Sequence, residues 1–314
     1  MITDPIRRLL DEYRTVVLDG GLATQLERAG ADLSDPLWSA RLLLDDPSLV
    51  FAAHVAYFEA GADLAISASY QASFEGFAAR GIDERDAAAL LRRSVQIARA
   101  ARDAFWGEGH EGRPRPLVAA SIGPYGAVLA NGAEYTGDYG IDTPALARFH
   151  ARRLDVLAAP ETGADLLAIE TIPSLREAEA VVRALEGRTA PAWMSFTCRD
   201  AETLADGSPF SEAVAVAAAA PSVVAVGVNC TAPSLIAPLV AVAATAGRPV
   251  VAYPNRGARW DAGRRRWIDA GEITRDLAAR APDWVAAGAR LVGGCCGTGP
   301  GDIREIAATL GRTA

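Results

Sequence analysis

Three of the four cysteines could converge on a metal ion. Cys230 ends one apolar run of the sequence, and Cys295 and Cys296 end another. Three thiolates are soft ligands of the kind that zinc accepts, and a three-residue set leaves one coordination position open. Buried reduced cysteines or a vicinal disulfide are the alternatives, because the spacing between Cys230 and the pair is long. Cys198 has no such partner, and we expect it to be a small buried core residue.

Two adjacent cysteines can bind one ion only if the chain bends where they lie. On an extended strand, successive side chains point to opposite faces. Glycines flank the pair in the sequence Gly293-Gly294-Cys295-Cys296-Gly297, and glycine permits a sharp change of backbone direction. A shared metal site therefore requires that the strand breaks at this point.

Carboxylate, amide and hydroxyl groups lie at the ends of other apolar runs. These groups belong to Asp19, Ser67, Ser69, Glu170, Thr171, Asn229 and Asn255. Asp19 and Glu170 could pair with ammonium groups of a substrate. The alternative is that each carboxylate caps a nearby turn or helix, and Thr171 and Pro173 do suggest a helix start beyond Glu170.

The composition excludes several other chemistries. The chain of 314 residues contains no lysine, so a Schiff-base aldolase, a pyridoxal-phosphate enzyme and a Walker-type phosphate site are ruled out. Three histidines make hydrolase sites with several histidine ligands improbable, and we expect His54 and His150 to pack within helices or at the surface. The formal net charge of −8 argues against nucleic acid and anionic membranes as partners.

The sequence also carries no pattern of a targeting or membrane segment. Residues 1–14 mix charges every few positions and do not resemble a signal peptide. The longest apolar stretch, Ala213–Val228, is interrupted by Pro221 and Gly227 and is shorter than the ~18 residues that a membrane span needs. We therefore expect a soluble, cytoplasmic protein that makes no contact with a membrane.

Eight short runs rich in β-branched residues predict the strands that must position these groups. Their interiors are nearly continuous apolar sequence, as expected for parallel strands covered on both faces. The predicted strands are Val16–Asp19, Asp63–Tyr70, Leu117–Gly123, Asp165–Thr171, Ala192–Thr197, Val223–Cys230, Pro249–Asn255 and Ala289–Cys295.

Segments of helical periodicity separate these runs. The predicted helices are Ile82–Trp106, Pro144–Ala159, Leu175–Leu185, Ser211–Ala219, Pro233–Ala246, Glu272–Ala281 and Pro300–Leu310. The alternation predicts an α/β fold, a single (β/α)₈ barrel of the TIM type that spans residues 1–314 as one domain. A doubly wound open sheet is the alternative, but no predicted strand is followed by G-x-G-x-x-G.

The connections that leave the strands are longer than those that enter them. Tyr125–Thr143, Cys198–Phe210 and Arg256–Gly271 are the long ones, and such loops form the catalytic face of a barrel. Tyr125, Trp260 and Trp267 lie in two of these loops and could stabilise a cation through their ring faces, although loop packing is the alternative. We expect the run Arg264-Arg265-Arg266 to be a solvated loop surface.

Several of these motifs together resemble the zinc-dependent homocysteine S-methyltransferases, and in particular the short branch that uses S-methylmethionine. The resemblance covers about residues 15–310 and rests on six motifs. They are Asp19-Gly20-Gly21-Leu22-Ala23-Thr24-Gln25-Leu26-Glu27, Ser67-Ala68-Ser69-Tyr70-Gln71, Ile169-Glu170-Thr171-Ile172-Pro173, Gly227-Val228-Asn229-Cys230 with Gly293-Gly294-Cys295-Cys296-Gly297, and Tyr253-Pro254-Asn255.

The resemblance implies roles for individual residues. It implies that Cys230, Cys295 and Cys296 bind Zn²⁺, and that the remaining members of the site bind substrate. Those members are Asp19, Glu170, Ser67 and Asn255. Tyr70-Gln71 stands where betaine-using relatives carry an aromatic donor pair, which disfavours betaine. The chain also lacks their C-terminal extension, which supports oligomerisation, so we expect a monomer.

The reaction that we expect is methyl transfer from S-methylmethionine to homocysteine, which yields two methionines. A free thiol is mostly protonated near pH 7 and is a poor nucleophile, whereas a metal-bound thiol loses its proton. S-adenosylmethionine as the donor and selenocysteine as the acceptor are alternatives within this class. A zinc-dependent hydrolase and a non-catalytic, zinc-stabilised barrel are the alternatives from other classes.

Overall fold

The computed structural model describes residues 2–33, 38–107, 109, 112–261, 266–269 and 276–312. Eight parallel strands form one sheet in the order β1-β10-β7-β6-β5-β4-β3-β2. A parallel bridge between Leu18 and Leu64 brings β1 back beside β2 and closes the sheet. The fold is therefore the predicted (β/α)₈ barrel, and the closure rules out the open doubly wound sheet.

The barrel strands lie within the predicted runs except that β4 extends one residue further, to Ile172. They are β1 (Val16–Val17), β2 (Leu64–Ile66), β3 (Leu117–Ile122), β4 (Leu166–Ile172), β5 (Ala192–Phe196), β6 (Val223–Asn229), β7 (Val250–Tyr253) and β10 (Ala289–Val292). Every described residue of β4 and β6 is buried, which explains their unbroken apolar sequence.

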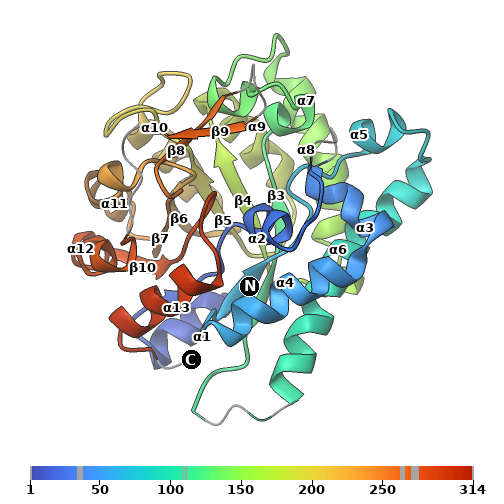
Figure 1. Cartoon of the computed structure of the whole chain (residues 1–314). Coiled ribbons are helices and arrows are strands. Elements are labelled where there is room, and N and C mark those ends of the chain that lie inside the picture. Colours follow the sequence, from blue (N-terminus) through green and yellow to red (C-terminus); the bar gives the residue numbers. More distant parts are fainter. Residues whose placement is uncertain are drawn as a thin grey trace.

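Helices follow every strand and cover the outside of the barrel (Figure 1). They are α2 (Leu22–Arg28), α3 (Leu42–Asp45), α4 (Pro47–Glu59), α5 (Phe74–Ala78), α6 (Glu84–Gly107), α7 (Tyr125–Leu129), α8 (Thr143–Leu157), α9 (Leu175–Leu185), α10 (Phe210–Ala219), α11 (Ile236–Ala244), α12 (Ala281–Ala287) and α13 (Pro300–Thr309). Asp46, Asp142 and Ser174 cap α4, α8 and α9 through backbone N–H groups, so local sequence fixes where these helices begin.

One predicted helix differs from the structure where the structure describes it. The prediction placed a helix over Glu272–Ala281; residues 272–275 lie outside the described residues, residues 278–280 form a 3₁₀ turn, and α12 begins at Ala281. Pro282 suits the first turn of α12, and Gly288 follows its last residue at a φ of 127°. These two residues define the helix more strongly than the apolar periodicity before them.

The loop after β7 also contains structure that was not predicted. Two strands, β8 (Ala258–Asp261) and β9 (Arg266–Asp269), pair in antiparallel fashion. In Figure 1 they lie on the side toward which the barrel strands point. The side chains of Trp260 and Trp267 lie outside what the structure describes, as do Arg264 and Arg265.

The two ends of the barrel differ. Ile6 and Leu9 of α1 (Pro5–Glu12) pack in the same cluster as the inward-facing strand residues Leu64, Leu166 and Trp193. Helix α1 therefore covers the end at which the strands begin, and the strand-end side is left for a site. Among the described residues, no helix has both the length and the apolar character needed to cross a membrane.

Candidate metal centre

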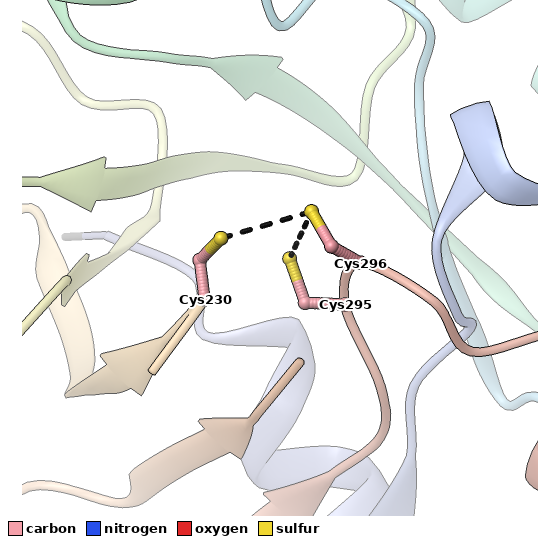
Figure 2. A group of neighbouring side chains, drawn as sticks. All are labelled: Cys230, Cys295 and Cys296. Atoms are coloured by element: carbon pink, nitrogen blue, oxygen red, sulfur yellow. Dashed lines mark hydrogen bonds between the residues drawn. The ribbon is translucent and has the colours of Figure 1, made fainter. Parts of the chain in front are cut away.

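Cys230, Cys295 and Cys296 converge at the strand-end side of the barrel, with their sulfurs turned toward one another (Figure 2). The Sγ atom of Cys296 lies 3.7 Å from that of Cys230 and 3.9 Å from that of Cys295. Three sulfurs on a tetrahedral zinc at ~2.3 Å would lie about 3.8 Å apart. The thiols are free, so the arrangement suits one shared metal ion and not the vicinal disulfide.

The chain bends at Cys295 and Cys296, as a shared metal site requires. Strand β10 ends at Val292, and the Cys295 N–H then donates to Pro254 O at 2.7 Å. Gly297 follows at a φ of 82°, in the left-handed region that favours glycine. A side chain at Gly294 would lie 2.3 Å from Thr298 Oγ1, so the turn also needs glycine for space.

Cys230 is held by the end of β6 in a strained conformation. Its φ is 48°, and Thr171 in β4, two strands away in the sheet, has a φ of 62°, both uncommon for residues with a Cβ. Asn229 connects the two: its Oδ1 accepts from Thr171 N and from Ser195 Oγ, each at 2.8 Å, and its Nδ2 donates to Thr171 Oγ1 at 2.7 Å. Asn229 is therefore a positioning residue for Cys230.

The pKa values of the three thiols depend on one another. Hydrogen bonds from Cys295 and then Cys296 hold the pKa of Cys230 well below its usual value, whereas the hydrogen bond to Cys230 raises the pKa of Cys295 and of Cys296. One thiolate is thus stabilised by two thiols, and ionising all three requires a positive charge between them. A metal ion would supply that charge.

Asp19 reaches the same end of the barrel directly after β1, with 1% of its surface exposed. Its Oδ2 accepts the Ile66 N–H at 2.8 Å, but Oδ1 is buried without a hydrogen-bond partner among the described residues. Burial raises the pKa of Asp19 well above its usual value, and the nearby Glu170 and Cys295 add to the rise. A free acceptor in such a place suits a cationic ligand.

Glu170 lies within β4, where the Ser121 hydroxyl donates to Oε1 and the Tyr253 hydroxyl donates to Oε2 at 3.1 Å. Burial raises its pKa to about 8, and these two hydrogen bonds oppose the rise. The capping alternative does not describe Glu170, because the helix that follows is capped by Ser174. Tyr253 and Ser121 were not predicted as site residues, since both lie inside strands and their partners follow only from the barrel register.

Ser67 and Asn255 also lie at the strand-end side, but both already form hydrogen bonds with other groups of the protein. The Ser67 hydroxyl lies 2.8 Å from Ser69 Oγ and accepts from Ser121 N at 3.2 Å. Asn255 Oδ1 accepts from Gly257 N at 3.4 Å, and the Asn255 N–H donates to Thr231 O. Their substrate-binding roles stay predictions.

Glu134 and Tyr135, which the residue patterns did not single out, approach the cysteines from the loop after β3. The Tyr135 hydroxyl lies 3.6 Å from Cys230 Sγ, and Glu134 carries a buried oxygen, Oε2, without a partner among the described residues. The length of the Tyr125–Thr143 loop was the only signal in the sequence. Tyr125 itself packs against Phe149 and Tyr139 with ring centroids 5.0 and 5.5 Å away, which fits the loop-packing alternative.

Cys198, His54 and His150 are buried and lie outside the metal-ligand group that the described residues form. His150 Nε2 contacts Glu177 Oε1 at 2.9 Å, and burial lowers the pKa of His54 to about 4. The prediction that these residues serve packing agrees with their surroundings, and both histidines are internal and not at the surface.

The family model for homocysteine S-methyltransferases matches residues 16–310. The chain belongs to this family. A homocysteine S-methyltransferase of Bacillus subtilis is 46% identical over 97% of both chains. A selenocysteine Se-methyltransferase of Brassica oleracea is 46% identical over 92% of this chain and 87% of its own.

A solved structure of the family has the same fold. The metallated form of a homocysteine methyltransferase from Escherichia coli is 44% identical, covers 97% of this chain and 99% of its own, and superposes with a TM-score of 0.86. That relative was solved in a metallated form, and this chain has a group of three converging cysteines. Together these findings indicate that this member of the homocysteine S-methyltransferase family has a site able to hold a metal ion.

Proposed function

We propose that this protein moves a methyl group from a sulfonium donor, with S-methylmethionine favoured, to the sulfur of homocysteine, and that it does so with zinc. The observation that carries the proposal is the group of three convergent thiols beside the buried carboxylate of Asp19, whose Oδ1 has no hydrogen-bond partner among the described residues. In the reaction, the donor's S–CH₃ bond breaks as the new S–CH₃ bond forms. The donor leaves as a neutral thioether, and the acceptor thiol gives up its proton.

Cys230, Cys295 and Cys296 fit zinc because all three offer soft sulfur at the spacing of a tetrahedral site. When bound, zinc supplies a positive charge that lowers the pKa of a thiol in its fourth position. The three cysteines fill only three positions, which disfavours a closed, purely structural zinc site. Described histidines are absent from the group, which disfavours a hydrolase.

Asp19 and Glu170 are proposed to bind the ammonium group of homocysteine. Within the described part of the chain nothing donates to Asp19 Oδ1, and Glu170 is linked electrostatically to both Asp19 and Cys295. An ammonium group beside them would lower both pKa values and keep the carboxylates ionised. Their part is to hold the acceptor in line with the donor, since methyl transfer from a sulfonium needs alignment more than proton transfer.

The finer assignments are also proposals. S-methylmethionine is favoured because Tyr70-Gln71 disfavours betaine, and S-adenosylmethionine stays an alternative donor. The relative from Brassica oleracea keeps selenocysteine open as an acceptor. We further propose Ser67 and Asn255 as neighbours of the substrates, one domain over residues 1–314, a monomer, and a cytoplasmic location.

Metal analysis combined with a methylation assay tests this function. Purified protein should contain about one zinc per chain and should convert homocysteine to methionine with S-methylmethionine. Cys296→Ser should lose the metal and more than about 10³-fold of kcat/KM, whereas Cys198→Ser should keep both. Equal zinc in wild type and Cys296→Ser would reject the ligand set, and zinc-loaded protein that uses no sulfonium donor would reject the activity.

A further inference from the structure

The loop between β3 and α8 carries an acidic residue, Glu134, to which the proposed function assigns no role. The loop contains α7 and a short 3₁₀ turn at Ala133–Tyr135. The Tyr135 hydroxyl contacts Cys230 Sγ at 3.6 Å, so the turn lies directly beside the thiol cluster. Glu134, the residue before it, is electrostatically coupled to Cys230, Tyr70 and Tyr135.

The carboxylate of Glu134 is incompletely bonded. Its Oε2 is buried and has no hydrogen-bond partner among the described residues. A buried acceptor without a donor is costly, and native structures rarely leave one without a use. Burial raises the pKa of Glu134 to about 7. Both facts describe a carboxylate that lacks a cationic donor.

The loop that presents Glu134 is braced at its two ends. Glu177 of α9 accepts the Tyr125 N–H at 2.6 Å and the Tyr139 hydroxyl at 2.8 Å, so one buried carboxylate holds both sides of the loop. A side chain at Gly126 would lie 2.4 Å from Glu134 N, which shows how closely α7 packs on the turn. The fold therefore holds the backbone that carries Glu134.

Glu134 and Asp19 approach the cluster beside different cysteines. The turn that carries Glu134 contacts Cys230 through the Tyr135 hydroxyl, whereas the backbone carbonyl of Asp19 accepts the N–H of Gly294, the residue before Cys295. In a direct methyl transfer, the accepting and leaving sulfurs lie on opposite sides of the methyl group, so two amino-acid substrates need two separate ammonium sites. A sulfonium has no N–H to donate, so an acceptor oxygen that lacks a donor suits an ammonium group.

We propose that Glu134 binds the ammonium group of the methyl donor, while Asp19 and Glu170 bind that of homocysteine. This inference rests on the proposed function and assigns the donor side of the same site. It makes Glu134 a residue that determines which sulfonium compounds serve as donors. Sulfonium compounds that lack an amino group gain nothing from it.

Glu134→Gln tests the inference, because it keeps the size of the side chain and removes the charge. In zinc-loaded protein, the Kd for S-methylmethionine measured by calorimetry should rise about 10- to 100-fold, and the donor KM should rise with it. The KM for homocysteine should stay within about threefold of the wild-type value. The zinc content should be unchanged. Asp19→Asn should give the opposite split, raising the homocysteine KM alone.

Glu161→Gln is the matched control, since Glu161 is exposed and lies before β4 at the far end of the barrel. Glu161→Gln should change neither the Kd for S-methylmethionine nor the Kd for homocysteine. An unchanged Kd for S-methylmethionine in Glu134→Gln would overturn the inference. The inference would also be overturned if Glu134→Gln weakened the binding of dimethylsulfoniopropionate, a sulfonium without an amino group, as much as it weakened the binding of S-methylmethionine. The calorimetric comparison decides the inference even if wild-type protein binds the donor but methylates nothing, a result that rejects the proposed function alone.

Discussion

The two ends of the barrel treat buried carboxylates in different ways. Where the strands begin, Asp63 precedes β2 and Asp165 precedes β4, and each accepts the N–H of the second residue of a neighbouring strand, Val17 of β1 and Val118 of β3 respectively. Each also has an arginine partner: Arg312 lies 2.7 Å from Asp63, and Arg102 lies 3.1 Å from Asp165. This repeated arrangement ties the starts of these strands to α6 and to the segment after α13.

Beside the thiol cluster, the carboxylates are met by neutral donors or by none. Asp19 accepts one backbone N–H, Glu170 accepts two hydroxyl groups, and the free oxygens of Asp19 and Glu134 have no partner among the described residues. The comparison teaches that the protein supplies the cation at one end, for stability. Beside the thiol cluster, the free oxygens of Asp19 and Glu134 suit the substrate ammonium groups that we propose they bind.

Asp63→Ala should give the largest effect on stability and separates the two ends most clearly. It leaves Arg312 and the Val17 N–H without their buried acceptor, so the free energy of unfolding should fall by about 3–5 kcal/mol. Chemical denaturation measures this, and the homocysteine KM below the melting temperature should be unchanged. Asp155→Ala, which breaks an exposed pair with Arg188, is the control and should cost less than about 1 kcal/mol. Equal costs for the two variants would contradict the comparison.

Glu170→Gln should change how stability depends on pH in the metal-free protein. Because burial raises the folded pKa of Glu170 to about 8 from 4.5, the folded state keeps a proton that the unfolded chain releases. Stability from this group is therefore present below pH 4.5 and is lost as the pH rises toward 8, by about 3 kcal/mol at pH 7.

Denaturation of wild type and Glu170→Gln at pH 5 and pH 7.5 measures this slope. Glu170→Gln should lose less stability than wild type between the two values. Parallel curves for the two proteins would show that Glu170 titrates normally in the folded state.

Asp19→Asn should give the smallest effect on stability and a clear effect on binding. Asparagine can still accept the Ile66 N–H, so the free energy of unfolding should stay within about 1 kcal/mol of wild type. The Kd for homocysteine should rise about 10- to 100-fold because the charge that faces the ammonium group is gone. A loss of stability as large as that of Asp63→Ala would place Asp19 with the structural carboxylates instead.

Much of the architecture could be predicted because it depends on local patterns. The eight apolar runs predicted the eight strands, and the flanking glycines predicted the break at Cys295 and Cys296. The helix expected over Glu272–Ala281 differs in its described part, where a 3₁₀ turn precedes α12, because the start and stop signals at Pro282 and Gly288 set the bounds of α12.

The sequence by itself determined the barrel, the rim on which the cysteines and Asp19 lie, and the absence of lysine chemistry, because strand periodicity and strand order follow from residue types along the chain. Only the tertiary structure decided which polar groups have hydrogen-bond partners. The shared acidity of the thiols, the hydroxyl partners of Glu170 and the free oxygens of Asp19 and Glu134 all depend on contacts between segments far apart in sequence. Burial and hydrogen bonding are properties of that packing, so the distinction between a structural and a binding carboxylate exists only in the folded protein.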